Sequence, residues 1–292
     1  MHKMRKGLLL FVVTFLMAMV VATSMTSCAG NGATKNSPKK TDSTSVVEDT
    51  THVDSLTALI EEEEMPESAD ELFDDFFFNY SGSRKVQRDR TIFPLVVNNN
   101  GKESKISRQD WHHEHFFMEE GYYTLISPDQ SELSLAKDTT VSDVTVEKLA
   151  LAKGEVTRWH FARQHGLWFM NGKTVERLGQ HPDAQFLTFY QKFATDSVYQ
   201  QHSLANPIDF TGPDPDDDFA NMTGSIMPAQ WPMFSPQFPS GTLFNIIYGE
   251  MDKQKYATNT RYFYIRGIAN GLQTDITFQK MGGRWVLKKI TM

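Results

Sequence analysis

An internal duplication constrains this chain more than any other feature, because a repeat decides the architecture before single motifs are weighed. Residues 71–80 (ELFDDFFFNY) recur as residues 184–193 (AQFLTFYQKF), with the aromatic side chains in the same register. Further matches follow in the same order along the chain. The matched pairs are Phe73/Phe186, Phe76/Phe189, Phe77/Tyr190, Tyr80/Phe193, Gln87/Gln200, Pro94/Pro207, Asp110/Gln230, Trp111/Trp231, Gly121/Gly241, Phe161/Phe278 and Trp168/Trp285.

The second copy is longer than the first between its matches at Pro207 and Trp231, where it holds residues 211–218 (TGPDPDDD). This composition predicts a loop. Because loops tolerate insertions, the extra length supports the alignment. We therefore expect two copies of one domain, at residues 66–178 and 179–292.

Each copy is predicted to begin with a helix, because its apolar side chains recur at intervals of three and four residues. These side chains lie within residues 72–80 in the first copy and within residues 186–193 in the second. Pro66 and Pro182 stand where the first helical turn should open. Shorter second helices are expected at residues 83–90 and 197–204.

The rest of each copy has the pattern of β-strands. Ile276 and Phe278 alternate with polar neighbours, which predicts a strand with one buried face. Glycine-containing pairs such as Lys153-Gly154 and Asn270-Gly271 fall where hairpin turns are needed. The expected strands are residues 122–127, 145–151, 155–163 and 167–175 in the first copy and residues 242–249, 261–268, 273–280 and 284–291 in the second.

The last of these segments carry a family resemblance. Residues 278–287 (FQKMGGRWVL) resemble the final hairpin of the nuclear-transport-factor-2-like, or cystatin-like, cone fold, and residues 161–169 repeat that pattern less cleanly. Residues 76–95 and 189–200 resemble a family of bacterial lipoproteins of unknown function with that fold. The resemblance implies an α+β protein of two tandem cone-shaped domains, each with N-terminal helices packed on a curved antiparallel sheet. It implies a fold and no particular chemistry.

The N-terminal segment has the form of a signal peptide. A basic head precedes an apolar run over residues 7–22, which is short for a membrane-spanning helix. Met25-Thr26-Ser27-Cys28 then resembles the lipobox of bacterial lipoproteins. The resemblance implies that residues 1–27 are removed, and that Cys28 carries a thioether-linked diacylglycerol and an N-linked acyl chain such as palmitate.

Cys28 is the only cysteine in the chain, and lipidation would consume a thiol that has no disulfide partner. The alternative is an ordinary signal peptide followed by an incidental cysteine. Residues 28–65 are poor in large apolar side chains, so we expect a flexible tether, with a short helix possible at 54–64. Acidic residues do not follow Cys28 directly, which favours an outer-membrane anchor facing the periplasm.

Charge excludes one class of partner. The chain has a net charge of −7, which becomes −10 once the three basic residues of the signal peptide are removed. A protein this acidic is not an electrostatic binder of nucleic acid.

Three segments carry candidate chemistry. His112, His113 and His115, with Glu114, are the densest group of possible metal ligands, but the second copy lacks them and a solvated loop is the favoured interpretation. Asp110 is a candidate buried acid for proton transfer, although its partner Gln230 cannot exchange a proton. Residues 214–218 are acidic but lack the spacing of a calcium loop.

We therefore predict no catalytic residue, no metal, no cofactor and Cys28 as the lipidation site. The leading hypothesis is a non-catalytic envelope lipoprotein that binds a small apolar molecule, a peptide or another envelope protein. The alternatives are an enzyme with a polar pocket in the first cone and a structural scaffold. An enzyme predicts convergent ionisable groups in one cone, a binder predicts an open cavity, and a scaffold predicts closed cones with an exposed apolar patch.

Overall fold

The aromatic repeats form the helices that the sequence predicts. In the computed structural model, which describes residues 67–292 except 118–119, 215–216, 250, 252 and 269, helix α3 (Phe73–Gly82) and helix α5 (Ala184–Thr195) each bury one aromatic face. The predicted signal peptide, Cys28 and the predicted tether lie outside the described residues. A short helix follows each, α4 (Arg84–Asp89) after α3 and α6 (Ser197–His202) after α5. The 3-10 helices are η1 (Glu67–Asp70), η2 (Gln130–Lys137), η3 (Leu151–Lys153), η4 (Leu178–Gln180), η5 (Pro228–Gln230) and η6 (Lys255–Ala257), and α7 (Trp231–Phe234) is a single helical turn.

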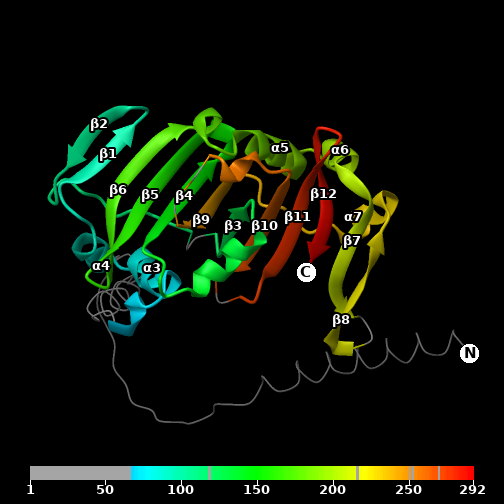
Figure 1. Ribbon diagram of the computed structural model, residues 1–292, viewed down its shortest axis with the longest axis horizontal. Coiled ribbons are helices and arrows are strands. Elements are labelled where there is room, and N and C mark those ends of the chain that lie inside the picture. The colour runs from blue at the N-terminus through cyan, green and yellow to red at the C-terminus, as the bar shows by residue number, and fades with distance from the viewer. Residues whose placement is uncertain (1–66, 118–119, 215–216, 250, 252, 269) are drawn as a thin grey trace, which may run out of the picture. The chain divides into compact units, whose positions relative to one another are not determined.

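The strands of both copies join in one sheet, which has twelve strands within the described part of the chain (Figure 1). Their order is β2-β1-β6-β5-β4-β9-β3-β10-β11-β12-β7-β8. The first copy contributes β1 (Leu95–Asn99), β2 (Lys102–Ile106), β3 (Tyr122–Ser127), β4 (Asp143–Ala150), β5 (Glu155–Gln164) and β6 (Leu167–Arg177). The second contributes β7 (Leu204–Asp214), β8 (Asp217–Ile226), β9 (Thr242–Tyr248), β10 (Thr260–Gly267), β11 (Gln273–Met281) and β12 (Arg284–Thr291).

The order shows that the two halves of the chain exchange one strand. Consecutive antiparallel strands usually lie side by side, so β3 would be expected beside β4 and β9 beside β10. Instead β9 pairs with β4, and β3 pairs with β10, in both cases antiparallel. Each copy therefore completes its sheet with the strand that comes from the other copy.

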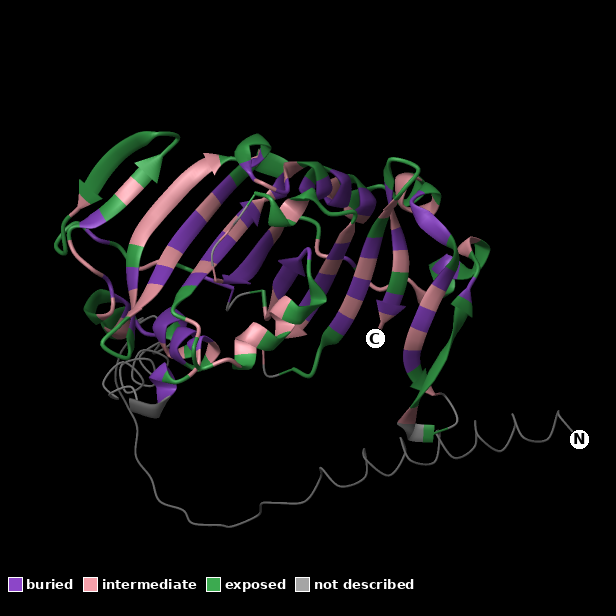
Figure 2. Ribbon diagram, in the orientation of Figure 1, coloured by how far each residue is buried: buried purple, intermediate pink, exposed green. Residues whose placement is uncertain are grey.

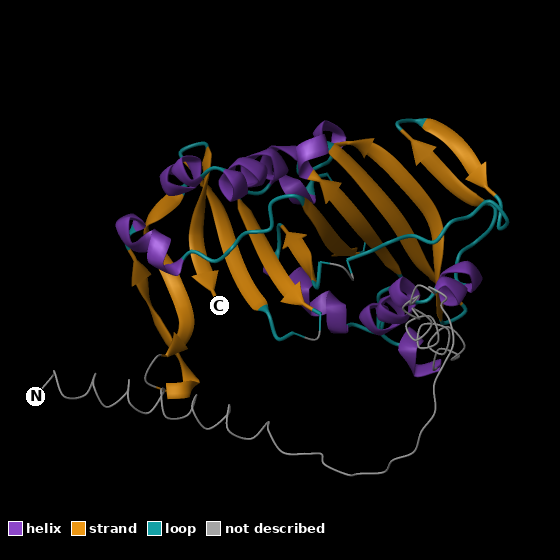
Figure 3. Cartoon of the chain, turned by 180° about the vertical axis from the view of Figure 1, so that it is seen from behind, coloured by secondary structure: helices purple, strands orange, loops and turns teal. Residues whose placement is uncertain are grey.

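The exchange places the two cores on opposite faces of the sheet. Successive side chains of a strand point to opposite faces. On β3, Leu125 packs into the core under α3, whereas Ile126 packs into the core under α5. Tyr264 and Ile265 of β10 divide in the same way. Buried residues therefore follow one another along β3 and β9 in the middle of the sheet (Figure 2), and Figure 3 shows α5 from the side opposite to Figure 1.

Side chains hold the junction between the exchanged strands, because β3 and β9 are parallel and share a single backbone pairing, Thr124 with Asn245. The Asn245 side-chain oxygen accepts a 2.8 Å hydrogen bond from the backbone N–H of Ile126. The Thr124 hydroxyl donates a 3.0 Å hydrogen bond to the backbone oxygen of Phe244. Both side chains are fully buried, so the polar backbone at the junction is satisfied without water.

The predicted strands agree with β3–β6 and β9–β12 within about two residues, and the α+β class is confirmed. One loop prediction was wrong, because residues 211–214 belong to β7 and residues 217–218 to β8. These two strands pair antiparallel, from Ile208 with Ile226 to Asp214 with Asp217. The division into separate domains at residues 178 and 179 stays a prediction, and the sheet continues across it.

Candidate functional site

An open polar cleft lies on the face of β5 and β6 that points away from α3. Its volume is ≈ 860 Å³, and a second hollow of ≈ 380 Å³ continues along the strands and shares Arg158 with it. The hairpin turn between β1 and β2 forms one wall, and the η4 turn forms another. The cleft is lined by Asn98, Asn100, Gly101, Arg158, Thr174, Val175, Glu176, Gly179, Gln180, His181, Pro182, Met251 and Lys253.

Arg158 is the central group of this cleft. It sits opposite Glu147 on the neighbouring strand and is 94% buried, with a relative exposure of 6%. Its Nε donates to Glu147 at 3.1 Å and its Nη1 donates to Glu176 at 2.6 Å. Its Nη2 is buried and has no hydrogen-bond partner among the residues that the structure describes. A buried donor left without a partner costs about 1–3 kcal/mol, and more for a charged group, so this atom has a strong preference for an added acceptor.

Glu147 joins Arg158 to two further side chains, His181 and Asn245. One carboxylate oxygen accepts from Arg158 and from His181 Nε2, each at 3.1 Å, and the other accepts from the Asn245 amide at 2.9 Å. Burial alone would raise the pKa of Glu147, but the electrostatic attraction and hydrogen bonds of these three groups outweigh it and lower the pKa to about 2. Glu147 is therefore ionised at neutral pH and serves to hold Arg158 in place.

His181 links Glu147 to the start of α5. Its Nε2 lies 3.1 Å from the Glu147 carboxylate, and its Nδ1 lies 2.9 Å from the backbone nitrogen of Asp183. Asp183 in turn forms two 2.7 Å hydrogen bonds with the guanidinium of Arg261. Burial raises the pKa of Asp183, and the bonds to Arg261 oppose that shift. The network thus runs from the cleft to the start of α5.

His160 lies beside Arg158 in the second hollow. Its Nε2 is 2.9 Å from the Thr174 hydroxyl and its Nδ1 is 3.4 Å from the Thr145 hydroxyl. Burial lowers the pKa of His160, and the positive charge of Arg158 lowers it further. His160 is therefore a neutral ring held between two hydroxyl groups.

The residues that the sequence singled out do not build this site. Asp110 is exposed and accepts a 2.6 Å hydrogen bond from Ser107, so the hypothesis that it is a buried acid was wrong. The side chain that does enter the core beside it is Trp111, which is buried. Trp111 therefore contributes to the packing of the core, and its position next to Asp110 does not indicate a proton-transfer site.

The histidine segment forms part of an ordered connection. The rings of His113 and His115 lie 5.1 Å apart. The backbone of Glu114 exchanges two hydrogen bonds with the Gln87 side chain, and its carboxylate pairs with Lys173. Within the described part of the chain, no group of three or more His, Cys, Asp or Glu side chains could hold a metal ion. Among the same residues, no helix is long and apolar enough to cross a membrane.

Comparison with known proteins identifies the family. A family model described as a domain of unknown function, DUF4348, matches residues 52–292. The chain belongs to this family. A crystal structure of a nuclear-transport-factor-2-like protein from Bacteroides fragilis NCTC 9343 is similar at 33% identity and a TM-score of 0.69. The match covers 78% of this chain and 98% of the other. No curated protein matches the chain.

The structural likeness confirms the nuclear-transport-factor-2-like fold that the resemblance implied, and the family is one of unknown function. The lipoprotein anchor and the tandem duplication stay predictions. Neither comparison assigns a chemistry to the fold. The cleft around Arg158 was missed by sequence reasoning. Glu147 and Arg158 occupy alternate positions of predicted strands, where polar side chains ordinarily face solvent. Glu147 and Arg158 are buried because the exchanged strand β9 lies beside β4 and because η4 covers them.

Proposed function

We propose that this DUF4348 protein is a cell-envelope lipoprotein, anchored through Cys28, that binds an uncharged polar ligand in the cleft at Arg158. The observation that carries the proposal is the buried Arg158 Nη2, which has no hydrogen-bond partner within the described part of the chain. A carbonyl or hydroxyl oxygen of a ligand would satisfy this donor.

The charges around Arg158 favour a neutral ligand over an anion. Glu147 and Glu176 both accept from Arg158, so the three side chains together carry a net charge of −1. Asp143 and Lys253, which also line the two hollows, offset each other. An additional anion would meet surplus negative charge, whereas a neutral oxygen acceptor would meet only the open donor.

The remaining lining supports the same class of ligand. Asn98, Asn100 and Gln180 contribute carboxamides, and Thr174 contributes a hydroxyl group. Such groups both donate and accept hydrogen bonds. They suit a ligand rich in amide or hydroxyl groups, and they differ from the apolar ligand that the sequence led us to expect.

Binding is favoured over catalysis at this site by the state of its ionisable groups. The low pKa of Glu147 and its three hydrogen-bond donors leave it poorly suited to exchange protons near neutral pH. His160 is held between two hydroxyl groups rather than beside a carboxylate that would orient it as a base. The arrangement resembles a preformed binding surface.

A cleft-filling substitution tests the binding proposal. A Cβ added at Gly179 meets no atom within 4 Å, so Gly179→Trp should fold and occupy the cleft. Gly224→Trp on β8 is the matched control, because its Cβ also meets open space away from the cleft. The soluble form, residues 29–292, would be incubated with a detergent extract of the source envelope and measured by native mass spectrometry.

We expect the parent and Gly224→Trp proteins to retain an added mass that is lost on denaturation, and the Gly179→Trp protein to lack it. An added mass that persists in Gly179→Trp, or none in any protein across repeated extracts, would contradict the proposal.

The anchor has its own test. Cells expressing the full chain would be labelled with an alkyne analogue of palmitate, and Cys28→Ala would be compared with the parent. We expect label and membrane fractionation for the parent, and neither for the Cys28→Ala protein. Label on the Cys28→Ala protein would contradict the assignment.

A further inference from the structure

A second cavity lies on the other side of the sheet, at the edge of the core under α3. Its volume is ≈ 220 Å³, and it shares no lining residue with the cleft at Arg158. Four aromatic rings and two carboxylates stand out in its lining. They are Phe77, Phe78, Phe117, Tyr123, Asp74 and Asp75.

The aromatic walls are held by mutual packing. The ring centroids of Phe77 and Phe117 are 5.3 Å apart, and those of Phe117 and Tyr123 are 5.4 Å apart. Phe78 on the outer turn of α3 is 55% exposed, which is unusual for a ring of its size. Aromatic faces carry partial negative charge and attract cations.

Asp74 is a fixed carboxylate inside this aromatic surround. The Tyr248 hydroxyl of β9 donates a hydrogen bond to it, so a strand from the second copy orients an acid of the first. Burial raises the pKa of Asp74, and the hydrogen bond from Tyr248 opposes that shift. Asp75 provides a second carboxylate at the exposed rim. Lys, Arg and His are absent from the described lining of the cavity.

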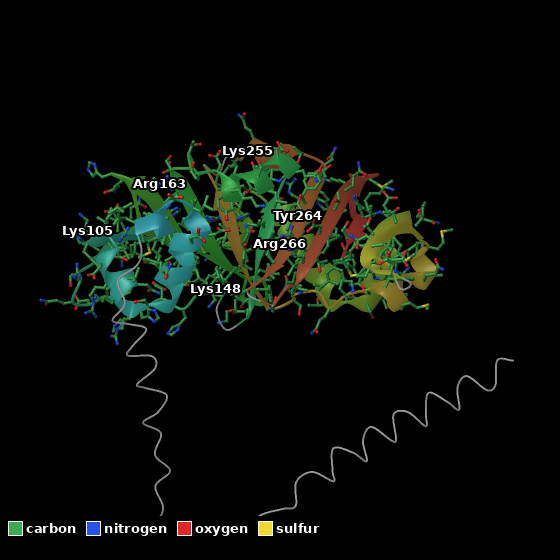
Figure 4. The ribbon with its side chains drawn as sticks, turned by 90° about the horizontal axis from the view of Figure 1, so that it is seen from below. Lys105, Lys148, Arg163, Lys255, Tyr264 and Arg266 are labelled. Atoms are coloured by element: carbon green, nitrogen blue, oxygen red, sulfur yellow. The ribbon has the colours of Figure 1, made fainter. Side chains whose placement is uncertain are left out.

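A guanidinium on the neighbouring strand is already paired. Burial and the charge of Asp74 raise the pKa of Tyr123 to about 12. Arg266, directly opposite Tyr123 in the β3–β10 ladder, opposes that shift with its positive charge. Its Nη1 forms a 2.6 Å ion pair with Asp275, and its guanidinium lies over the Tyr264 ring (Figure 4). Asp74 and Asp75 therefore remain the excess charge at the cavity.

The second copy shows that the fold does not need this acid. The position matched to Asp74 is Leu187, which is 1% exposed in the core under α5. The position matched to Phe78 is Gln191. Leu187 thus fills the core under α5 at the position where Asp74 lines the aromatic cavity under α3.

We propose that this cavity binds a small organic ammonium ion. Asp74 would neutralise the cation, the rings of Phe77, Phe117 and Tyr123 would contact its apolar substituents, and Asp75 would attract it at the rim. The site is independent of the proposed function at Arg158, because it lies on the opposite face of the sheet.

Choline and tetramethylammonium are suitable probes, and 3,3-dimethyl-1-butanol is the matched neutral control because carbon replaces the nitrogen of choline. Binding to residues 29–292 would be measured by isothermal titration calorimetry at pH 7.5. We expect at least about tenfold weaker binding of the neutral alcohol, since it loses both the cation–π and the carboxylate attraction.

Asp74→Leu copies the residue of the second half and should remove choline binding while its urea unfolding shows a folded protein. Asp74→Asn keeps the size of the side chain and should weaken choline binding by a similar factor. Gly179→Trp should bind choline like the parent, which separates this site from the Arg158 cleft. Equal affinity for choline and the neutral alcohol, or no millimolar binding of either ammonium ion, would overturn the proposal.

Discussion

In the first half of the sheet, Glu147 and Arg158 face each other across β4 and β5, whereas the matched positions in the second half hold Tyr264 and Asp275. The first pair is buried beneath η4 and forms the floor of a cleft. In the second half, Arg266 occupies the space over Tyr264 and binds Asp275. The two halves of the sheet therefore carry different polar side chains on the face that points away from their own helix.

A second comparison concerns an acidic residue that both halves carry before their first helix. Asp70 before α3 and Asp183 before α5 are matched, and each binds an arginine through both carboxylate oxygens. The arginines are not matched, because Arg90 follows α4 whereas Arg261 lies on β10. The two halves therefore share the position of the acid, whereas the arginine that binds it comes from a different element in each half.

The largest effect is expected for the buried pair of the second half. Arg261→Met leaves Asp183 without its partner in a site where both are less than 5% exposed, which should cost about 3–5 kcal/mol of unfolding free energy. Arg90→Met should cost less, because the Arg90 side chain is 18% exposed and water can replace part of the pair. Urea unfolding followed by tryptophan fluorescence would measure both. Equal losses of unfolding free energy in Arg261→Met and Arg90→Met would contradict this difference between the two ion pairs.

The pH dependence of stability should distinguish the first half. Because the folded-state pKa of Glu147 is about 2 and its ordinary value is 4.5, its ionised form stabilises the fold above pH 4.5. That contribution is lost as the pH falls from 4.5 toward 2. Relative to Glu147→Gln, the parent should lose about 3 kcal/mol of unfolding free energy over this range.

Glu155→Gln provides the control for this measurement, since Glu155 is an exposed carboxylate of β5. The parent and Glu155→Gln proteins should show the same pH dependence. A Glu147→Gln protein with the slope of the parent would refute the assigned role of Glu147.

A smaller effect is expected at the strand junction. Asn245→Leu introduces the residue that the first half carries at the matched position, Leu125. It removes the acceptor for the buried N–H of Ile126 and the donor to Glu147, which should cost about 2 kcal/mol. Thr124→Val removes one hydrogen bond and should cost about 1 kcal/mol. Thermal or urea unfolding would measure both, and a neutral Asn245→Leu would show that the junction is held by packing alone.

The elements that sequence reasoning predicted are those with a strong local period. The aromatic spacing of Phe73 to Tyr80 predicted α3, and the alternation around Ile276 predicted β11. The hairpins β1–β2 and β7–β8 were missed. Most of β2 is exposed, and β7 contains Pro207 and Pro213, so neither shows a clear alternation of apolar and polar residues.

The exchange of β3 and β9 has no local signature. Both strands have apolar residues on both faces. Their hydrophobic pattern therefore does not indicate whether each strand pairs within its own half or with the other half. The Arg158 cleft depends on that exchange, because Asn245 of β9 donates to Glu147 of β4. A site assembled from both copies in this way could not be predicted from motifs within one copy.

An engineered disulfide tests the strand exchange most directly, since the chain contains no cysteine other than Cys28. Thr145 and Ile247 are directly opposite in the β4–β9 ladder, and opposed residues in antiparallel strands lie within disulfide range. If the copies did not exchange strands, Ser127 would take the place of Ile247 beside Thr145. Thiol titration of oxidised residues 29–292 should find a disulfide in Thr145→Cys/Ile247→Cys and free thiols in Thr145→Cys/Ser127→Cys. The reverse result would contradict the exchanged sheet.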